Sequence, residues 1–123
     1  FATYGGFWIG LGLWALLVAP KAASPAAANH DIAWILLTFA IINTYLLILS
    51  TQVNMAVFLV FLTLEATEII LFIGLFGGST GTVKFGGYVG LVTALVAFYT
   101  SAAGISNGLA GKLRFPVGRP LIS

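Results

Sequence analysis

Long runs of apolar residues, separated by short polar or glycine- and proline-containing segments, set the pattern of this chain. Each run approaches the roughly 20 residues that a helix needs to cross about 30 Å of hydrocarbon. The pattern therefore predicts an all-α fold, a polytopic transmembrane helix bundle that forms a single transmembrane domain over residues 1–123. The four predicted helices cover approximately residues 4–19, 32–50, 55–76 and 85–105.

The segments between the apolar runs carry residues that end helices or form turns. Pro20 ends the first run, the polar residues 51–54 form a short turn, and the glycine-rich residues 77–82 form a loop. Asn29 or Asp31 is a candidate N-cap of the second helix. The last 18 residues form a different segment. Residues 106–123 contain two prolines and three basic residues, which predicts an irregular tail outside the bilayer.

Composition supports a membrane protein and excludes a soluble globular domain. The chain is 60% hydrophobic and only 7% charged, whereas a soluble domain carries about 25% charged residues. It has no cysteine, which excludes disulfides and thiolate metal sites. No metal site or cofactor is predicted, and the net charge of +2 reports topology rather than nucleic-acid binding.

Basic residues indicate which way the bundle faces. The tail side holds three basic residues and no acidic one, whereas the other side holds Lys21, Lys84 and Asp31. The positive-inside rule then places the C-terminus in the cytoplasm. The chain starts with Phe1 rather than Met, and we interpret it as part of a longer protein.

Two carboxyl groups near the middle of the third run are the most informative residues. Glu65 and Glu68 are costly at that depth, by about 2.5–3.5 kcal/mol each on insertion scales. They share one helical stripe with Phe61, Leu64 and Phe72. The stripe is either a pore or proton-relay face, or an interior face whose carboxyls are bonded to threonines. We expect at least one of the two to keep its proton at neutral pH.

Other candidates have simpler interpretations. By composition alone, Tyr4 is an aromatic anchor at the membrane interface. Glycine pairs at helical spacing, Gly6 with Gly10 and Gly86 with Gly90, indicate close helix packing. No nucleophile–base pair or cofactor motif is present, so the chain is not expected to be an enzyme.

Several motifs together resemble one family. The segment of residues 1–8, Phe-Ala-Thr-Tyr-Gly-Gly-Phe-Trp, opens a membrane helix, and residues 85–90, Phe-Gly-Gly-Tyr-Val-Gly, open the last one. Pro20-Lys21, Phe72-Ile73-Gly74 and Arg119-Pro120 follow in the same order and spacing. The chain resembles the succinate–acetate permease family, also called the acetate uptake transporters, along essentially its whole length.

The resemblance implies a six-helix protein of which this chain holds the last four helices. Members of the family look like hexameric channels or proton-coupled carriers for acetate and related small carboxylates. Their constriction has three residues, and carried over one at a time these include Tyr4 and, counting back from Gly74, Leu64. The third, an aromatic residue of the first helix, would lie upstream. Pore lining then outweighs the anchor role for Tyr4. Glu65 and Glu68 depart from the family pattern, which is apolar there.

These observations lead to one principal hypothesis and two alternatives. The principal hypothesis is a channel or proton-coupled transporter for acetate and similar mono- or dicarboxylates. It places Tyr4 and Leu64 at the constriction, Glu65 and Glu68 as proton-linked or pore-facing groups, and Phe61 and Phe72 as pathway neighbours. It implies a homo-oligomer in the plasma or inner membrane, with no nucleic-acid partner. The alternatives are a structural accessory subunit of a larger membrane complex and a proton-translocating proteolipid.

Overall fold

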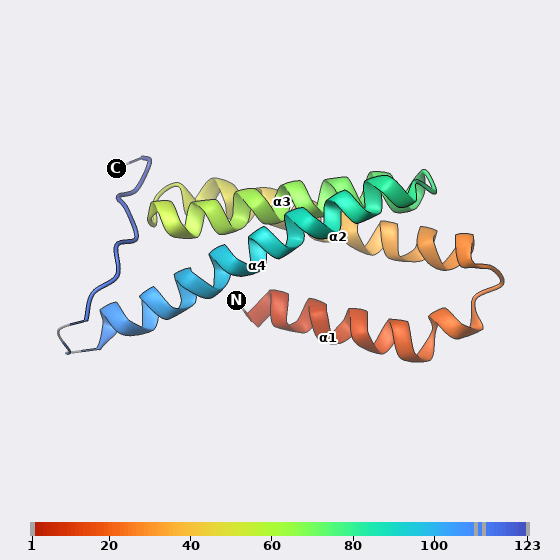
Figure 1. Ribbon diagram of the computed structural model, residues 1–123, viewed down its shortest axis with the longest axis horizontal. Helices are drawn as coiled ribbons and strands as arrows, with labels where there is room; N and C mark the ends of the chain where they lie inside the picture. Colours follow the sequence, from red (N-terminus) through yellow and green to blue (C-terminus); the bar gives the residue numbers. More distant parts are fainter. Residues whose placement is uncertain (1, 110, 112, 123) are drawn as a thin grey trace.

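The computed structural model describes residues 2–109, 111 and 113–122, and within these ranges the chain is all-helical apart from loops and the tail. The predicted helical membrane bundle is confirmed. Figure 1 shows long helices packed against one another, one of them crossing its neighbours obliquely, and a shorter N-terminal helix set apart from the others. The elements are α1 (Ala2–Leu17), the short 3-10 helix η1 (Ala19–Lys21), α2 (Pro25–Ser50), α3 (Met55–Phe76) and α4 (Thr80–Gly108).

Helix α2 starts several residues before its predicted beginning. Ser24 is its N-cap, and the Ser24 hydroxyl accepts a hydrogen bond from the backbone N–H of Ala27 at 3.1 Å. Pro25 occupies the first turn, where its fixed φ suits the helix and its missing N–H costs nothing. Asn29 and Asp31 therefore lie inside α2, and the prediction that one of them caps it is wrong.

Helix α4 likewise starts earlier than predicted, because a serine caps it. The hydroxyl of Ser79 accepts from the backbone N–H of Thr82, so the helix begins at Thr80 within the predicted glycine-rich loop. Helix α3 covers the predicted residues, with Asn54 accepting from the N–H of Val57 at its start.

The helices differ in how much of a membrane they can cross. In the described part of the chain, α2, α3 and α4 are long and apolar enough to span it. Helix α1 has 16 residues and so rises about 24 Å. Its N-terminal end lies level with the middle of the bundle in Figure 1. The Tyr4 hydroxyl bonds to Asn43, seven residues before the end of α2, so Tyr4 lies within the bundle rather than at its end.

Helix α3 is the centre of the bundle, packing on α2 along one side and on α4 along the other. Glycines allow the close approach of α4. A Cβ at Gly74 would lie 2.8 Å from the backbone nitrogen of Val83, and one at Gly86 would lie 2.8 Å from the side chain of Leu71. The predicted packing role therefore fits Gly86, whereas Gly6 and Gly10 meet nothing within 4 Å among the described residues.

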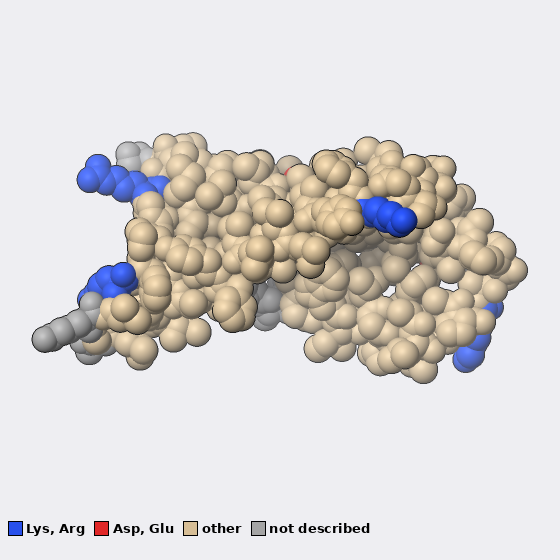
Figure 2. Space-filling view, viewed as in Figure 1, with Lys and Arg blue, Asp and Glu red and all other residues tan. Residues whose placement is uncertain are grey.

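The tail turns back across the end of the bundle. The backbone N–H of Leu121 donates to the carbonyl of Thr51 at 2.8 Å, and the N–H of Ala56 donates to the carbonyl of Val117 at 2.9 Å. These bonds fix the tail, without regular secondary structure, against the α2–α3 turn and the start of α3. Figure 2 shows basic side chains toward both ends of the molecule and an uncharged surface over most of the face between them.

Candidate functional site

A cavity of about 550 Å³ lies between α1, α3 and α4. We refer to it as the central cavity. Tyr4 from α1 and Leu64 from α3 both line it, so the structure brings together the two residues assigned to the constriction. Apart from the hydroxyls of Tyr4, Thr67 and Thr93 and the indole of Trp8, the side chains of its wall are apolar or absent, as at the glycines of α4.

The Tyr4 hydroxyl is held by a buried asparagine on α2. It donates to Oδ1 of Asn43 at 2.6 Å, and Asn43 is fully buried. The Asn43 amide nitrogen donates to the carbonyl oxygen of Phe61 at 2.9 Å and to Oε2 of Glu65 at 2.7 Å. Every hydrogen-bonding atom of the Asn43 side chain therefore has a partner, and one residue connects α1, α2 and α3.

Aromatic rings surround the Tyr4 side chain and fix its position. The Tyr4 ring lies 6.5 Å from the ring of Phe7, 6.1 Å from Phe39 and 6.3 Å from Phe61, measured between centroids. Phe7 and Phe39 are themselves only 4.2 Å apart. Such tilted and edge-on contacts add to the burial of apolar area, so the hydroxyl of Tyr4 sits at a defined point of the cavity wall.

Glu65 faces α2 rather than the central cavity. Its Oε2 accepts from Asn43, and its Oε1 lies 2.7 Å from the hydroxyl of Thr44. Glu65 is half-buried and Thr44 is exposed on this chain. The Glu65–Thr44 pair therefore lies between α2 and α3, at the outer surface of their contact.

Glu68 has the opposite environment. Its side chain is 1% exposed, and its two carboxyl oxygens have no hydrogen-bond partner among the described residues. It lies one turn from Leu64 on α3, next to Thr67. The helical wheel placed Glu65 and Glu68 on one stripe, but the structure directs Glu65 to α2 and buries Glu68 within the bundle.

Two threonines form the polar part of the cavity wall between α3 and α4. The hydroxyls of Thr67 and Thr93 are 3.1 Å apart, and both residues are buried. Thr67 also bonds to the carbonyl of Thr63 at 2.8 Å, and Thr93 to the carbonyl of Val89 at 3.1 Å. These bonds join the two helices at the depth of Leu64.

The predicted pathway neighbours separate in the structure. Phe61 touches the Tyr4 ring and accepts from Asn43. Phe72 lies instead in a second aromatic cluster, with its ring 6.2 Å from Trp34 and 5.6 Å from Phe76. The structure therefore brings Phe61 to the Tyr4 site and leaves Phe72 near the end of α3.

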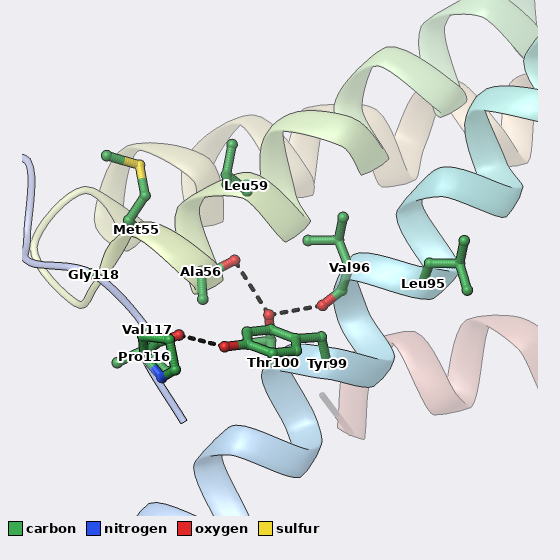
Figure 3. Close-up of a pocket in the computed structure, with 10 residues that line it drawn as sticks. All are labelled: Met55, Ala56, Leu59, Leu95, Val96, Tyr99, Thr100, Pro116, Val117 and Gly118. Carbon is green, nitrogen blue, oxygen red and sulfur yellow. Dashed lines mark hydrogen bonds between the residues drawn. The ribbon is translucent and has the colours of Figure 1, made fainter. Parts of the chain in front are cut away.

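A second pocket, of about 460 Å³, lies where the tail meets α3 and α4 (Figure 3). We refer to it as the tail pocket. The Tyr99 hydroxyl donates to the carbonyl of Pro116 at 2.7 Å, and Thr100 bonds to the carbonyl of Val96 at 2.8 Å. Both hydroxyls are thus bound to backbone oxygens within the chain, and the remaining wall is mostly apolar.

Sequence reasoning missed Asn43, Thr44 and Thr93 as site residues. The signal was present, because Asn43 and Thr44 lie mid-way along an apolar helix, where a polar side chain needs a partner. No group of three or more metal-ligating side chains occurs in the parts of the chain that the structure describes. The site can bind a small polar molecule through hydroxyls and an apolar wall.

Comparison with known proteins gives a consistent result. The GPR1/FUN34/yaaH family matches residues 1–118 of the chain. No solved structure matches the chain at a significant level.

Curated relatives include proteins named for transport. Succinate-acetate/proton symporter SatP of Escherichia coli is 29% identical over 119 residues, which cover 96% of this chain and 62% of the relative. Acetate permease A of Emericella nidulans is 28% identical, covering 94% and 44%. Ammonia transport outward protein 2 of Saccharomyces cerevisiae is 26% identical, covering 85% and 39%. The chain thus spans between 39% and 62% of the length of these relatives, and they are named as transporters or permeases rather than enzymes.

Proposed function

Because the chain belongs to the GPR1/FUN34/yaaH family, we propose that it forms part of a channel or proton-coupled transporter for acetate and similar small mono- and dicarboxylates. The observation that carries this proposal is the shared position of Tyr4 and Leu64 on the wall of the central cavity. An apolar constriction with a few placed polar groups is a usual means of selection in membrane pathways. The names of the bacterial and fungal relatives support acetate as the substrate.

The two carboxyl groups have separate roles in this proposal. Glu65 stabilises the Tyr4–Asn43 pair through its bond to Asn43. Glu68 gives a proton to the carboxylate that passes the constriction: the proton leaves the Glu68 carboxyl for a substrate oxygen and crosses with the substrate, and Glu68 then takes a new proton from the side at which the substrate entered. Its burial, with no hydrogen-bond partner among the described residues, supports this role, because an ionisable group at membrane depth is retained for function.

Replacement of Glu68 by glutamine tests the proton role. We expect Glu68→Gln to lower acetate uptake at pH 7 and to have little effect at pH 5, where more of the acetic acid is already protonated. Glu68→Asp, which keeps a carboxyl, should restore part of the rate at pH 7. An equal loss at both pH values would indicate a structural role for Glu68 instead.

The assembly and orientation are also proposals. The resemblance supports a homo-oligomer, a hexamer, in the plasma or inner membrane. The basic residues Arg114 and Arg119 at the tail end support a cytoplasmic C-terminus. The alternative, an accessory subunit of a larger membrane complex, predicts a stable stoichiometric partner on purification, whereas the transporter predicts self-association.

Uptake of labelled acetate by vesicles containing the full-length protein tests the function directly. We expect uptake above that of protein-free vesicles, with competition by unlabelled acetate and by succinate. Ammonium chloride is included as a competitor because of the activity named for the yeast relative. Absence of acetate uptake, or inhibition by ammonium alone, would contradict a carboxylate transporter.

A further inference from the structure

The orientation of the Asn43 amide determines where the Tyr4 proton lies. The carbonyl oxygen of Phe61 can only accept, so the amide atom 2.9 Å from it must be the nitrogen. The other atom of the amide, Oδ1, can only accept, and it lies 2.6 Å from the Tyr4 hydroxyl. Tyr4 therefore donates its single proton to Asn43 and has none left for a ligand.

The threonine hydroxyls of the cavity are committed in the same way. Thr67 and Thr93 together have two protons for three short contacts, one to each other and two to backbone carbonyls, so two of these contacts are hydrogen bonds at any one time. Carbonyl oxygens cannot donate, so both protons are used within the protein. Toward the cavity these two hydroxyls, like that of Tyr4, can offer only lone pairs.

Charged residues add no hydrogen-bond donor to the wall of the central cavity. No lysine, arginine or histidine is among the residues that line the central cavity, and Trp8 has the only side-chain N–H there. The carboxyls of Glu65 and Glu68 lie on α3 at this depth, whereas the described charged residues of α2 and α4, Asp31 and Lys84, lie near the helix starts. The polar wall thus accepts hydrogen bonds, and its nearest ionisable neighbours are acidic.

A carboxylate anion has acceptors only, so apart from the Trp8 N–H it would meet acceptors in this cavity and leave most of its charge uncompensated. The undissociated acid has one O–H donor, which can bond to the Tyr4 oxygen, while its carbonyl can accept from Trp8. We propose that the central cavity binds the undissociated form of a small carboxylic acid, and that Asn43, by taking the Tyr4 proton, sets this preference. The proposal rests on the transport function above and names the chemical form of its substrate.

Acetamide and acetone provide a matched pair of probes. Both are neutral and have four non-hydrogen atoms, but only acetamide can donate a hydrogen bond. Saturation-transfer NMR on the solubilised full-length protein reports binding of both methyl groups in one sample, without any need for transport. We expect acetamide to bind about tenfold or more tightly than acetone, since a site built around hydrogen bonding rejects an analogue that lacks the group, and acetate at pH 8 to bind more weakly than acetamide.

Single variants identify the residue that causes the preference for acetamide over acetone. Tyr4→Phe removes the acceptor, so the ratio of acetamide to acetone binding should fall to about one. Tyr99→Phe removes a hydroxyl from the tail pocket and should leave the ratio unchanged. Asn43→Leu releases the Tyr4 proton and should raise the relative binding of acetate at pH 8.

The outcomes separate this proposal from the proposed function. Equal binding of acetamide and acetone by the wild-type protein, or tighter binding of acetate at pH 8 than of acetamide, overturns the proposal even if vesicles take up acetate. If the wild-type protein prefers acetamide and Tyr4→Phe loses that preference, the proposal about the central cavity is supported. This holds even if vesicles take up no acetate and the transport function is contradicted. Because the first comparison uses only the wild-type protein, instability of a variant does not prevent a decision.

Discussion

The central cavity and the tail pocket have similar volumes, yet their polar groups are satisfied in different ways. Around the central cavity, side chains from three helices bond to one another, as Tyr4, Asn43 and Glu65 do. In the tail pocket, the hydroxyls of Tyr99 and Thr100 bond to backbone carbonyls (Figure 3). The first arrangement depends on particular residue types at three places, whereas the second requires only backbone carbonyls, of the tail for Tyr99 and of α4 for Thr100.

This difference indicates that the central cavity is a recognition site, whereas the tail pocket only holds the tail against the bundle. Helical backbone N–H groups at mid-membrane depth are already paired, so a side-chain acceptor there needs a side-chain donor, as Oδ1 of Asn43 does from Tyr4. At the bundle end the irregular tail has free carbonyls and N–H groups, and single side chains can satisfy them. Substitutions around Asn43 should therefore change both stability and substrate selection, while those in the tail pocket should change only stability.

Asn43→Leu is expected to have the largest effect on stability. It removes the acceptor of the Tyr4 hydroxyl and the donor to Oε2 of Glu65, and a buried group left unpaired costs about 1–3 kcal/mol. We expect a clear fall in the thermal midpoint of the solubilised protein, followed by size-exclusion chromatography after heating. Asn29→Leu, the same change at an exposed position of α2, is the control. Equal midpoints for the two variants would contradict the network.

Gly74→Ala should destabilise the contact between α3 and α4. The added methyl group would lie 2.8 Å from the backbone nitrogen of Val83, which cannot move independently of its helix. Overpacking of this kind costs about 1–3 kcal/mol. Gly81→Ala, where nothing lies within 4 Å, should be tolerated in the same thermal assay. A stable Gly74→Ala variant would mean that the two helices pack less closely.

Gly118→Ala should release the tail while leaving the bundle folded. Gly118 has a φ of 76°, and a Cβ there would lie 2.5 Å from the Cβ of Met55. The left-handed conformation alone costs a residue with a side chain about 1–2 kcal/mol. Limited proteolysis should cut the tail faster than in Gly111→Ala, whose added methyl meets no atom within 4 Å. Unchanged cleavage would show that the tail does not depend on this turn.

Tyr99→Phe should have the smallest effect. It removes one bond, from the hydroxyl to the Pro116 carbonyl, worth about 0.5–1.5 kcal/mol. Acetate uptake should stay at the wild-type level, which separates the tail pocket from the central cavity. Tyr88→Phe, at an exposed position, controls for loss of a hydroxyl as such. A loss of uptake in Tyr99→Phe alone would place the tail pocket on the pathway.

The sequence predicted the architecture because long apolar runs have few alternatives in a membrane. It did not predict the helix starts at Pro25 and Thr80, because the serine caps there had weaker signals than the apolar pattern. For Tyr4, composition alone indicated an interface anchor and the family resemblance indicated the pore, and neither gives its depth in the bundle. That depth follows from the bond to Asn43, which is a tertiary contact.

For the site, the family resemblance indicated Tyr4 and Leu64, and the structure brings both to one cavity. The helical wheel was less informative, because residues on one stripe can differ in depth. Phe61 and Phe72 are 11 positions apart, which is roughly 16 Å along a helix, and only Phe61 reaches Tyr4. The pairing of Asn43 with Glu65 depends on how α2 packs against α3, which periodicity within one helix does not encode.

The most direct test of the central claim uses the absence of cysteine from the chain. Single variants Leu64→Cys, in the cavity wall, and Leu62→Cys, on the exposed side of α3, are treated in vesicles with a water-soluble thiol reagent. If the central cavity is the substrate pathway, Leu64→Cys reacts, acetate slows the reaction, and Leu62→Cys stays unmodified in lipid. Modification of Leu62→Cys without modification of Leu64→Cys, or no protection by acetate, would contradict the account.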